Sequence, residues 1–506
     1  MSASRLRRTS LGALALTGAS ALRLSLQFAL LPILARLVGP AEYGLVALAM
    51  PFILFANVLA DGGMSYALGR RTEVSRELES TVFWLAGGLG LALALATAAA
   101  AWPMGALLNQ PRLPLLLAAL SPIMLMNGLT AASNGRIIRE GRFGAFAAGD
   151  LISTLASAAV AVGAALQGYG AWSLVAQQLT LWVCKLAWVT YAGKARIAFA
   201  FRLGEARALV RFGLHTIGAT LADFVSRNVD NMIVGGVLGA TTLGYYAMAY
   251  QVIRVPDMLI TGPFYYYIFT ALSRAAHAGD DAAIQRLTQG GLRLGSTALA
   301  PLFCSLALTA DLAVPLVLGG KWLPAIGALR WLSGAGFAFC ICSMMAAMLT
   351  GLGRANLQLR LSIVLGAVTI MTVGAGVGFG LTPTAAALAA GMGLVSLFYL
   401  DQLARDLRTP RRALLATFAP ATMGCAALAA AVTCARYLLR QAETDVIFLG
   451  SMLAGLAAYA LIVWAASRRQ LLADAQAFAS AQEDDGSGPD RPQTETAGNA
   501  ELTPAA

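Results

Sequence analysis

Long apolar stretches, separated by short polar segments, run along the chain from about residue 13 to residue 467. They reach about 20 residues or more, the length that an α-helix needs to cross the roughly 30 Å hydrocarbon core of a bilayer. An outer-membrane barrel would instead show segments of about 10 residues with alternating polarity. We therefore expect an all-α membrane protein of about 14 transmembrane helices. The pattern predicts these helices at residues 13–34, 43–68, 81–102, 114–134, 144–166, 171–192, 209–235, 244–272, 289–318, 323–351, 361–379, 384–404, 414–434 and 446–467.

The basic residues predict the orientation of these helices. With the N-terminus placed in the cytoplasm, 25 of the 36 Lys and Arg residues fall in cytoplasmic segments and 6 in segments on the opposite side. Basic loops are retained on the cytoplasmic side. We therefore expect an even number of helices in a bacterial inner (cytoplasmic) membrane, with both termini cytoplasmic. Residues 468–506 end in an acidic stretch rich in Pro, Gly, Ser and Thr, which predicts a disordered cytoplasmic tail.

Composition supports a membrane protein and argues against a nucleic-acid-binding one. The chain is 58% hydrophobic and only 12% charged, whereas a soluble domain carries roughly 25% charged residues. The net charge of +11 is dispersed over short loops, and no folded polar domain is present to hold DNA. All six Cys residues lie in or beside apolar segments, where we interpret them as small packing residues.

An internal repeat divides the chain into two lobes. The segment Leu37–Met50 aligns with Val237–Tyr250 at a constant offset of 200, and six predicted helices separate the two copies. Both copies therefore run in the same direction, as in transporters whose halves are related by an axis along the membrane normal. We expect an N-terminal lobe of six helices over residues 1–200, a pseudo-symmetric six-helix lobe over residues 201–412, and two further helices within residues 413–467.

Motifs for enzymatic chemistry are absent from the sequence. No GxxxxGK phosphate-binding loop occurs, which argues against ATP hydrolysis. His215 and His277 are far apart and near predicted helix ends, so we expect no metal site and no cofactor. The predicted outer loops, such as residues 167–170 and 381–383, are too short to form an extramembrane domain.

Charged residues within the predicted spans are the candidates for function, because a charge at mid-bilayer is costly unless it faces a partner or a wet cavity. Asp223, Arg227 and Asp230 are spaced i, i+4 and i+7, which places them on one face of a helix. The offset of 200 brings Arg23 and Gln27 to the matching positions of the first helix. We expect these five residues to line a cavity between the lobes.

Five more charged residues lie within predicted spans. For these, as for the first group, the alternative is that they form ion pairs that only stabilise the packing, and the sequence leaves both readings open. They are Asp61, Asp150, Lys185, Arg254 and Asp257.

Several stretches resemble the polysaccharide transporters of the multidrug/oligosaccharidyl-lipid/polysaccharide exporter superfamily, the Wzx-type flippases. The resemblance extends over about residues 15–410. The residues that carry it are Leu34–Gly44, Thr81–Trp84, Gly170–Gln178, Ser226–Asn231 and Leu243–Tyr250.

The resemblance implies a MATE-like fold and the translocation of undecaprenyl-diphosphate-linked repeat units for exopolysaccharide, capsule or O-antigen. It also implies alternating access driven by an H+ or Na+ gradient, and polysaccharide polymerase and export machinery as partners. Arginine is suited to grip a diphosphate, so we assign that role to Arg23 and Arg227. Two alternatives stay open: a drug antiporter of the same fold, whose cavity would be acidic and aromatic, and a membrane polymerase or ligase, which would need a sizeable outer loop.

Overall fold

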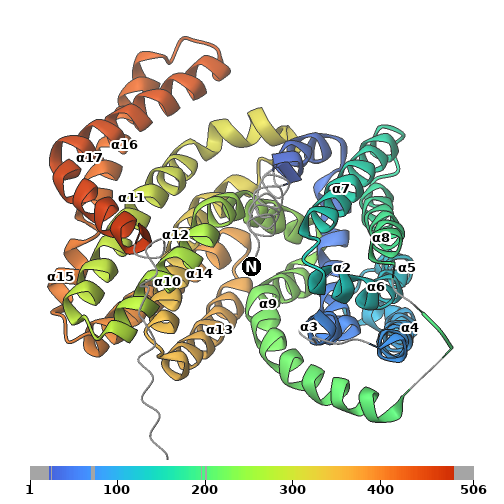
Figure 1. Cartoon of the computed structure of the whole chain (residues 1–506). Coiled ribbons are helices and arrows are strands. Elements are labelled where there is room, and N and C mark those ends of the chain that lie inside the picture. Colours follow the sequence, from blue (N-terminus) through green and yellow to red (C-terminus); the bar gives the residue numbers. More distant parts are fainter. Residues whose placement is uncertain (1–21, 24, 70–74, 195–196, 200–201, 484–506) are drawn as a thin grey trace, which may run out of the picture.

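The computed structural model describes residues 22–23, 25–69, 75–194, 197–199 and 202–483, and these residues form helices joined by short turns, without a β-strand among them (Figure 1). A first helix covers Ser25–Leu37. Short π-helices cover Asp257–Thr261 (η1) and Val314–Leu318 (η2), and Gly320–Trp322 (η3) is a 3-10 helix. The α-helices are α2 Pro40–Asp61, α3 Met64–Gly69, α4 Arg76–Leu107, α5 Leu113–Leu120, α6 Pro122–Arg139, α7 Phe143–Leu166, α8 Ala171–Gly193, α9 Leu203–Pro256, α10 Gly262–Ala278, α11 Asp281–Ala313, α12 Ala325–Gly351, α13 Ala355–Val377, α14 Leu381–Asp406, α15 Arg411–Ala416, α16 Ala419–Leu438 and α17 Thr444–Glu483.

Eleven helices of the described part are long and apolar enough to cross a membrane. The described part of the first helix, Ser25–Leu37, is shorter than a full span, and α8 is not among the eleven. One continuous stretch, Asn228–Ala278, counts once although it covers parts of two predicted helices. The all-α membrane fold is thus confirmed, and the total of about fourteen spans stays a prediction.

Gly239 divides α9 into two halves. The sequence predicts a loop at residues 239–243, but the helix is interrupted at Gly239 alone, with φ 82° and ψ 169°, and helical geometry resumes at once. A positive φ of this kind is accessible to glycine at little cost, so the connection needs only one residue.

The predicted start of the disordered tail at residue 468 is wrong. Helix α17 continues to Glu483, because residues beyond the membrane find partners on the second lobe. Phe478 is buried between α10 and α11, and its ring contacts Phe264 and Tyr267. Asp474 forms an ion pair of 2.6 Å with Arg293. The prediction of disorder for residues 484–506 falls outside the described residues.

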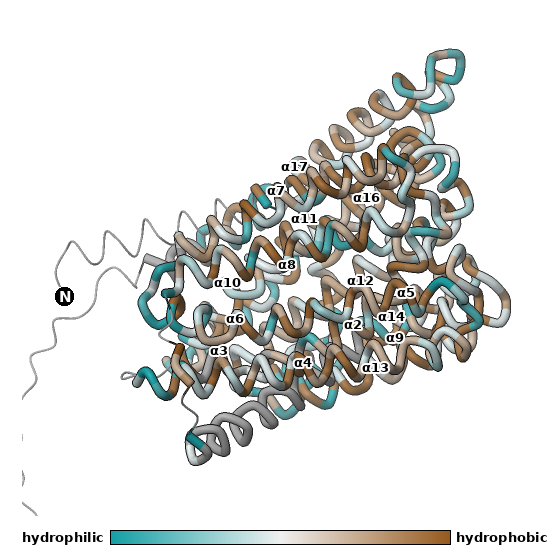
Figure 2. The backbone as a smooth tube through the Cα atoms, turned by 90° about the vertical axis from the view of Figure 1, so that its right-hand side faces the viewer, coloured by the Kyte–Doolittle hydropathy of each residue, from teal (hydrophilic) through white to brown (hydrophobic). Residues whose placement is uncertain are grey.

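The helices are arranged as two lobes with α9 in contact with both (Figure 1). The first lobe contains the first helix and α2 to α8, and the second contains α10 to α14. Helices α16 and α17 pack on each other and against α11. Figure 2 shows hydrophobic residues along the helices and hydrophilic ones gathered at the two ends of the bundle. Large apolar side chains such as Leu394 and Leu453 are exposed on the outside, as expected for a surface that faces lipid.

Candidate functional site: a cavity between the lobes

A cavity of about 540 Å³ lies between the first helix, α2, α8 and α9, and so between the two lobes. One side of its wall is apolar, with residues such as Leu31 and Met50. The rest carries side-chain amides, which can both donate and accept hydrogen bonds. These amides belong to Gln27, Gln177, Gln178, Asn228, Asn231 and Gln251.

Helical spacing brings the amides of α9 onto the wall. Asn228 and Asn231 are three residues apart, as are Gln251 and Arg254, and residues at this spacing share a helix face. The Oδ1 atom of Asn231 is buried and accepts no hydrogen bond from any described residue. Together these side chains form a polar surface within an otherwise apolar bundle, and such a surface can bind a polar ligand.

Among the residues that the structure describes, Arg254 is the one charged residue on the cavity wall. Among the described residues, no ion pair within 4 Å involves its guanidinium, which lies on the wall of the cavity. A second cavity of about 400 Å³ lies within the second lobe and shares Tyr250 and Arg254 with the first. Asp257 lines this second cavity, and its Oδ1 atom lies 3.7 Å from the Sγ atom of Cys340.

The other predicted site residues are placed differently. Arg23 does not line the cavity; its Nη1 atom lies 3.1 Å from Oδ2 of Asp150, and Nζ of Lys185 lies 2.9 Å from Oδ1 of the same carboxylate. The Lys185 ammonium also lies over the ring of Phe146, 5.3 Å from its centroid. Three of the predicted intramembrane charges thus form one cluster inside the first lobe.

Asp230 is buried beside the cavity without lining it. Its Oδ2 atom accepts a hydrogen bond of 3.0 Å from the Tyr246 hydroxyl, and its Oδ1 atom accepts one of 2.8 Å from the backbone N–H of Asn231. Gln27 and Arg254 therefore line the cavity together, whereas Arg23 and Asp230 are not part of its lining. The side chains of Asp61, Asp223 and Arg227 lie outside the described part of the chain.

Most of these amides are not found by looking for charged residues within apolar stretches. Gln177, Gln178, Asn228, Asn231 and Gln251 are uncharged, yet each lies in an apolar stretch where an amide is also costly. Their spacing on α8 and α9 is the signal that could have identified them.

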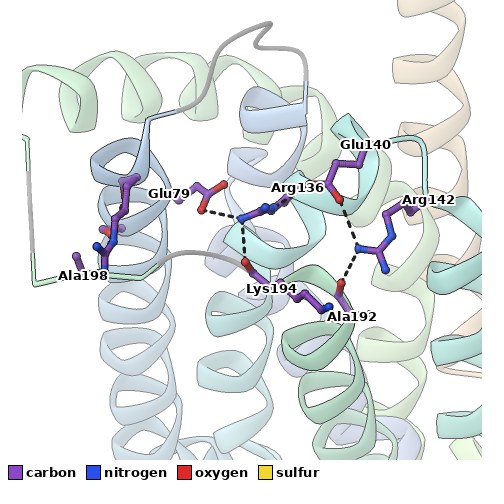
Figure 3. Close-up of polar contacts among 9 residues, drawn as sticks. Glu79, Arg136, Glu140, Arg142, Ala192, Lys194 and Ala198 are labelled. Carbon is purple, nitrogen blue, oxygen red and sulfur yellow. Dashed lines mark hydrogen bonds and ion pairs between the residues drawn. The ribbon is translucent and has the colours of Figure 1, made fainter.

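A separate polar network lies at the end of the first lobe where α4 begins and α6 and α8 end (Figure 3). Arg136 pairs with the buried Glu79 at 3.5 Å and with Glu140 at 2.8 Å, and it donates a hydrogen bond of 2.8 Å to the backbone carbonyl of Lys194. Arg142 donates to the carbonyl of Ala192 at 2.8 Å. These contacts satisfy carbonyl groups at the end of α8 and hold the start of the connection between the lobes on the first lobe.

Comparisons with known proteins agree with this architecture. The chain is 26% identical over 331 residues to the succinoglycan biosynthesis transport protein ExoT of Rhizobium meliloti (strain 1021), covering 65% of this chain and 66% of that protein, slightly less than two thirds of its length. It is 23% identical over 342 residues to the lipopolysaccharide biosynthesis protein WzxC of Escherichia coli (strain K12), covering 65% of this chain and 67% of WzxC.

Solved structures share the fold. The lipid II flippase MurJ, in an inward closed conformation, superimposes with a TM-score of 0.73 at 14% identity, covering 90% of this chain and 99% of MurJ. An inward-facing multidrug resistance MATE transporter of the MOP superfamily gives 0.61 at 16% identity, covering 76% and 94%. The family described as polysaccharide biosynthesis protein matches residues 33–327, more than half of the sequence. The chain therefore belongs to the polysaccharide biosynthesis protein family, and the resemblance noted in its sequence is confirmed.

Proposed function

We propose that this protein translocates lipid-linked oligosaccharides, joined to undecaprenyl through a diphosphate, across the bacterial inner membrane for the synthesis of a surface polysaccharide. The observation that carries the proposal is the interlobe cavity, lined by amides and by Arg254. Amides match the hydroxyl groups of sugars, which also donate and accept hydrogen bonds. The guanidinium group suits a diphosphate, to which it can donate two parallel hydrogen bonds.

Support also comes from what related proteins do. ExoT and WzxC are named for succinoglycan transport and lipopolysaccharide biosynthesis, and MurJ for flipping lipid II. We further propose that an H+ or Na+ gradient drives the cycle and that a polysaccharide polymerase receives the translocated unit.

No group of three or more His, Cys, Asp or Glu residues that could hold a metal occurs in the described part of the chain.

A drug antiporter of the same fold is the second candidate, and the cavity disfavours it. A cationic drug would require carboxylates on the wall, but none of the described residues that line this cavity is an Asp or a Glu: Asp257 lines the second cavity, and Asp230 accepts its hydrogen bond from Tyr246 beside the wall. A polymerase or ligase would be an enzyme, whereas ExoT is named as a transport protein and MurJ as a flippase. We infer that this protein is a transporter as well.

The proposal can be tested with purified protein in proteoliposomes. Undecaprenyl-diphosphate-linked oligosaccharide is placed in both leaflets, and a membrane-impermeant glycosidase reports the fraction of head groups that reaches the outside. We expect this fraction to rise above the roughly half that is exposed without protein. If the protein leaves this fraction unchanged but takes up a cationic dye when a pH gradient is applied, it is the antiporter instead.

Arg254 provides the residue-level version of this test. Removing a phosphate contact from a desolvated site costs roughly 2–5 kcal/mol, so Arg254→Gln should slow translocation at least about 30-fold. Arg254→Lys should retain part of the rate, because the charge remains but the planar fork is lost. Arg286→Gln, at an exposed arginine of α11, is the control. Equal rates for Arg254→Gln and this control would remove Arg254 from the binding site.

A further inference from the structure

The two copies of the sequence repeat meet directly where α2 crosses the second half of α9. A Cβ atom added to Gly44 would lie 1.7 Å from the carbonyl oxygen of Ala240, and one added to Gly244 would lie 2.0 Å from the carbonyl oxygen of Pro40. The contact is reciprocal: each glycine lies against the first turn of the other helix. Backbones can approach this closely only where neither residue has a side chain.

Trp322 joins the same contact from the second lobe. Its side chain is fully buried, and its Nε1–H donates a hydrogen bond of 2.8 Å to the carbonyl oxygen of Ala35 in the first helix. Tyr43 of α2 and Tyr245 of α9 both approach its ring edge-on, with centroids at 5.8 and 6.1 Å. Arg36 adds a hydrogen bond of 3.2 Å from Nε to the carbonyl oxygen of Val317. Every one of these contacts except that of Tyr245 joins the first lobe to the second.

This cluster closes one end of the interlobe cavity. On α2 the cavity wall begins at Tyr43, next to Gly44, and continues along the helix to Leu54. On α9 it includes Ala247, three residues beyond Gly244. Helix α2 leads away from this contact, and the network of Arg136 and Glu140 lies at the other end of the first lobe, the end that is predicted to be cytoplasmic.

We propose that the contact of Gly44 with Gly244, fastened by Trp322, is the extracytoplasmic gate of the cavity. In this structure the gate is closed, and the glycines act as positioning residues because their missing side chains allow the lobes to meet. Release of a cargo on the outer side then requires these backbones to separate. The inference rests on the cavity being the transport path, as proposed above, but it concerns how that path closes.

Cysteine accessibility tests the gate without any cargo. In a full-length chain whose six cysteines are replaced, a single cysteine is placed at Ala47 or at Ala247, both on the cavity wall. Cells with a permeabilised outer membrane are treated with a membrane-impermeant maleimide. We expect weak labelling in the parent and at least a fivefold increase with Gly44→Ala or Gly244→Ala, because the added methyl group prevents closure.

Gly39→Ala is the matched control, since a Cβ atom at Gly39 would meet nothing within 4 Å although the residue lies only five positions from Gly44. It should leave the labelling at the parent level. If Gly44→Ala and Gly244→Ala give no increase, or if Gly39→Ala increases labelling equally, the gate assignment is wrong.

If the glycine variants are not found in the membrane, a variant that adds no steric clash provides the test. Trp322→Phe removes the hydrogen bond to Ala35 and shortens the ring that packs between Tyr43 and Tyr245, without adding any atom, and we expect at least a twofold increase in labelling. No increase would overturn the proposal. If the labelling responds as expected but the protein does not translocate lipid-linked oligosaccharide, the gate assignment holds and the proposed cargo is wrong.

Discussion

At the scale of single residues, Asp150 determines what Arg23 does in this structure. Its carboxylate lies within 3.1 Å of Arg23 and 2.9 Å of Lys185, and less than a fifth of its side chain is exposed. Two cations on one carboxylate leave a surplus positive charge inside the first lobe. The hypothesis that Arg23 binds a diphosphate stays a prediction, and the geometry offers a structural role as its competitor.

Substitutions in this cluster separate the two roles. Arg23→Gln alone should change stability little, because Lys185 still neutralises Asp150, whereas Arg23→Gln with Lys185→Gln leaves a buried carboxylate without a partner and should cost about 3–5 kcal/mol. Adding Asp150→Asn should restore most of the loss. Thermal unfolding in detergent measures these effects. If Arg23→Gln alone abolishes translocation at unchanged stability, Arg23 binds the substrate after all.

At the scale of elements, the extension of α17 is attached to the second lobe rather than free. Besides the ring contacts of Phe478, its backbone carbonyl accepts a hydrogen bond of 2.6 Å from the Tyr267 hydroxyl. Asp474, four residues before Phe478 and so one helical turn away, is paired with Arg293. Helix α10 also carries Tyr265, which lines the second cavity, so the extension holds a helix that forms part of a cavity wall.

Replacement of Phe478 measures this attachment. Phe478→Ala should cost about 3 kcal/mol, since it empties a packed site. Leu472→Ala on the same helix is the control, because Leu472 is about half exposed. The readout is the melting temperature in detergent, together with proteolysis of the extension. Equal effects of the two variants would show that the extension is not held by Phe478. Truncation of residues 484–506 alone should leave translocation unchanged, because the contacts that attach α17 to the second lobe lie before residue 484.

The network at the end of α6 contains a carboxylate, Glu140, whose protonation bears on how the start of the connection between the lobes is held. Burial raises the pKa of Glu140, but the hydrogen bonds and charges of Arg136 and Arg142 outweigh it, and the net effect is a pKa below the ordinary value. A carboxylate whose pKa is lowered in the folded state stabilises the protein above its unfolded pKa, and this stability is lost as the pH falls through the folded value.

Acidification should therefore loosen this end of the first lobe. Between pH 7 and about pH 5.5 the contribution of Glu140 is expected to be nearly constant, and it is then lost as the pH falls past the ordinary carboxyl pKa of 4.5 and through the lower folded value. Glu140→Gln should lower the melting temperature at pH 7 and flatten its decline below about pH 5. Glu443→Gln, at an exposed position between α16 and α17, should do neither. A Glu140→Gln protein with the acid profile of the parent would contradict the assignment.

At the scale of the whole molecule, sidedness follows from the distribution of basic residues. Reporter fusions at Arg139 and Arg354 should report cytoplasm, and fusions at Gly168 and Pro383 should report periplasm. A fusion after Glu483 should again be cytoplasmic, and this position spares the docked part of α17. A periplasmic signal there would require an odd number of spans, whereas a cytoplasmic signal at Gly168 would reverse the inside and outside of the proposed gate.

The sequence by itself determined the features that depend on local pattern. Apolar length predicts the helices, because a span must satisfy its backbone within the bilayer. The offset of 200 predicted two lobes, and Gly44 and Gly244 prove to be the residues at which the two copies touch. The family followed from short motifs within residues 15–410, and the family match at residues 33–327 confirms it.

Only the tertiary structure decided what each polar residue faces. A helical pattern places Arg254 and Asp230 in the membrane but does not show what they face: Asp230 meets Tyr246 across the break of α9 at Gly239, while Arg254 opens onto the cavity. Other partners are far apart in the sequence. Arg23 contacts Asp150, which is 127 residues away, and Phe478 contacts Tyr267, which is 211 residues away. Desolvation makes each buried polar group take the nearest partner that the packing provides, and packing is set by contacts that no local pattern records.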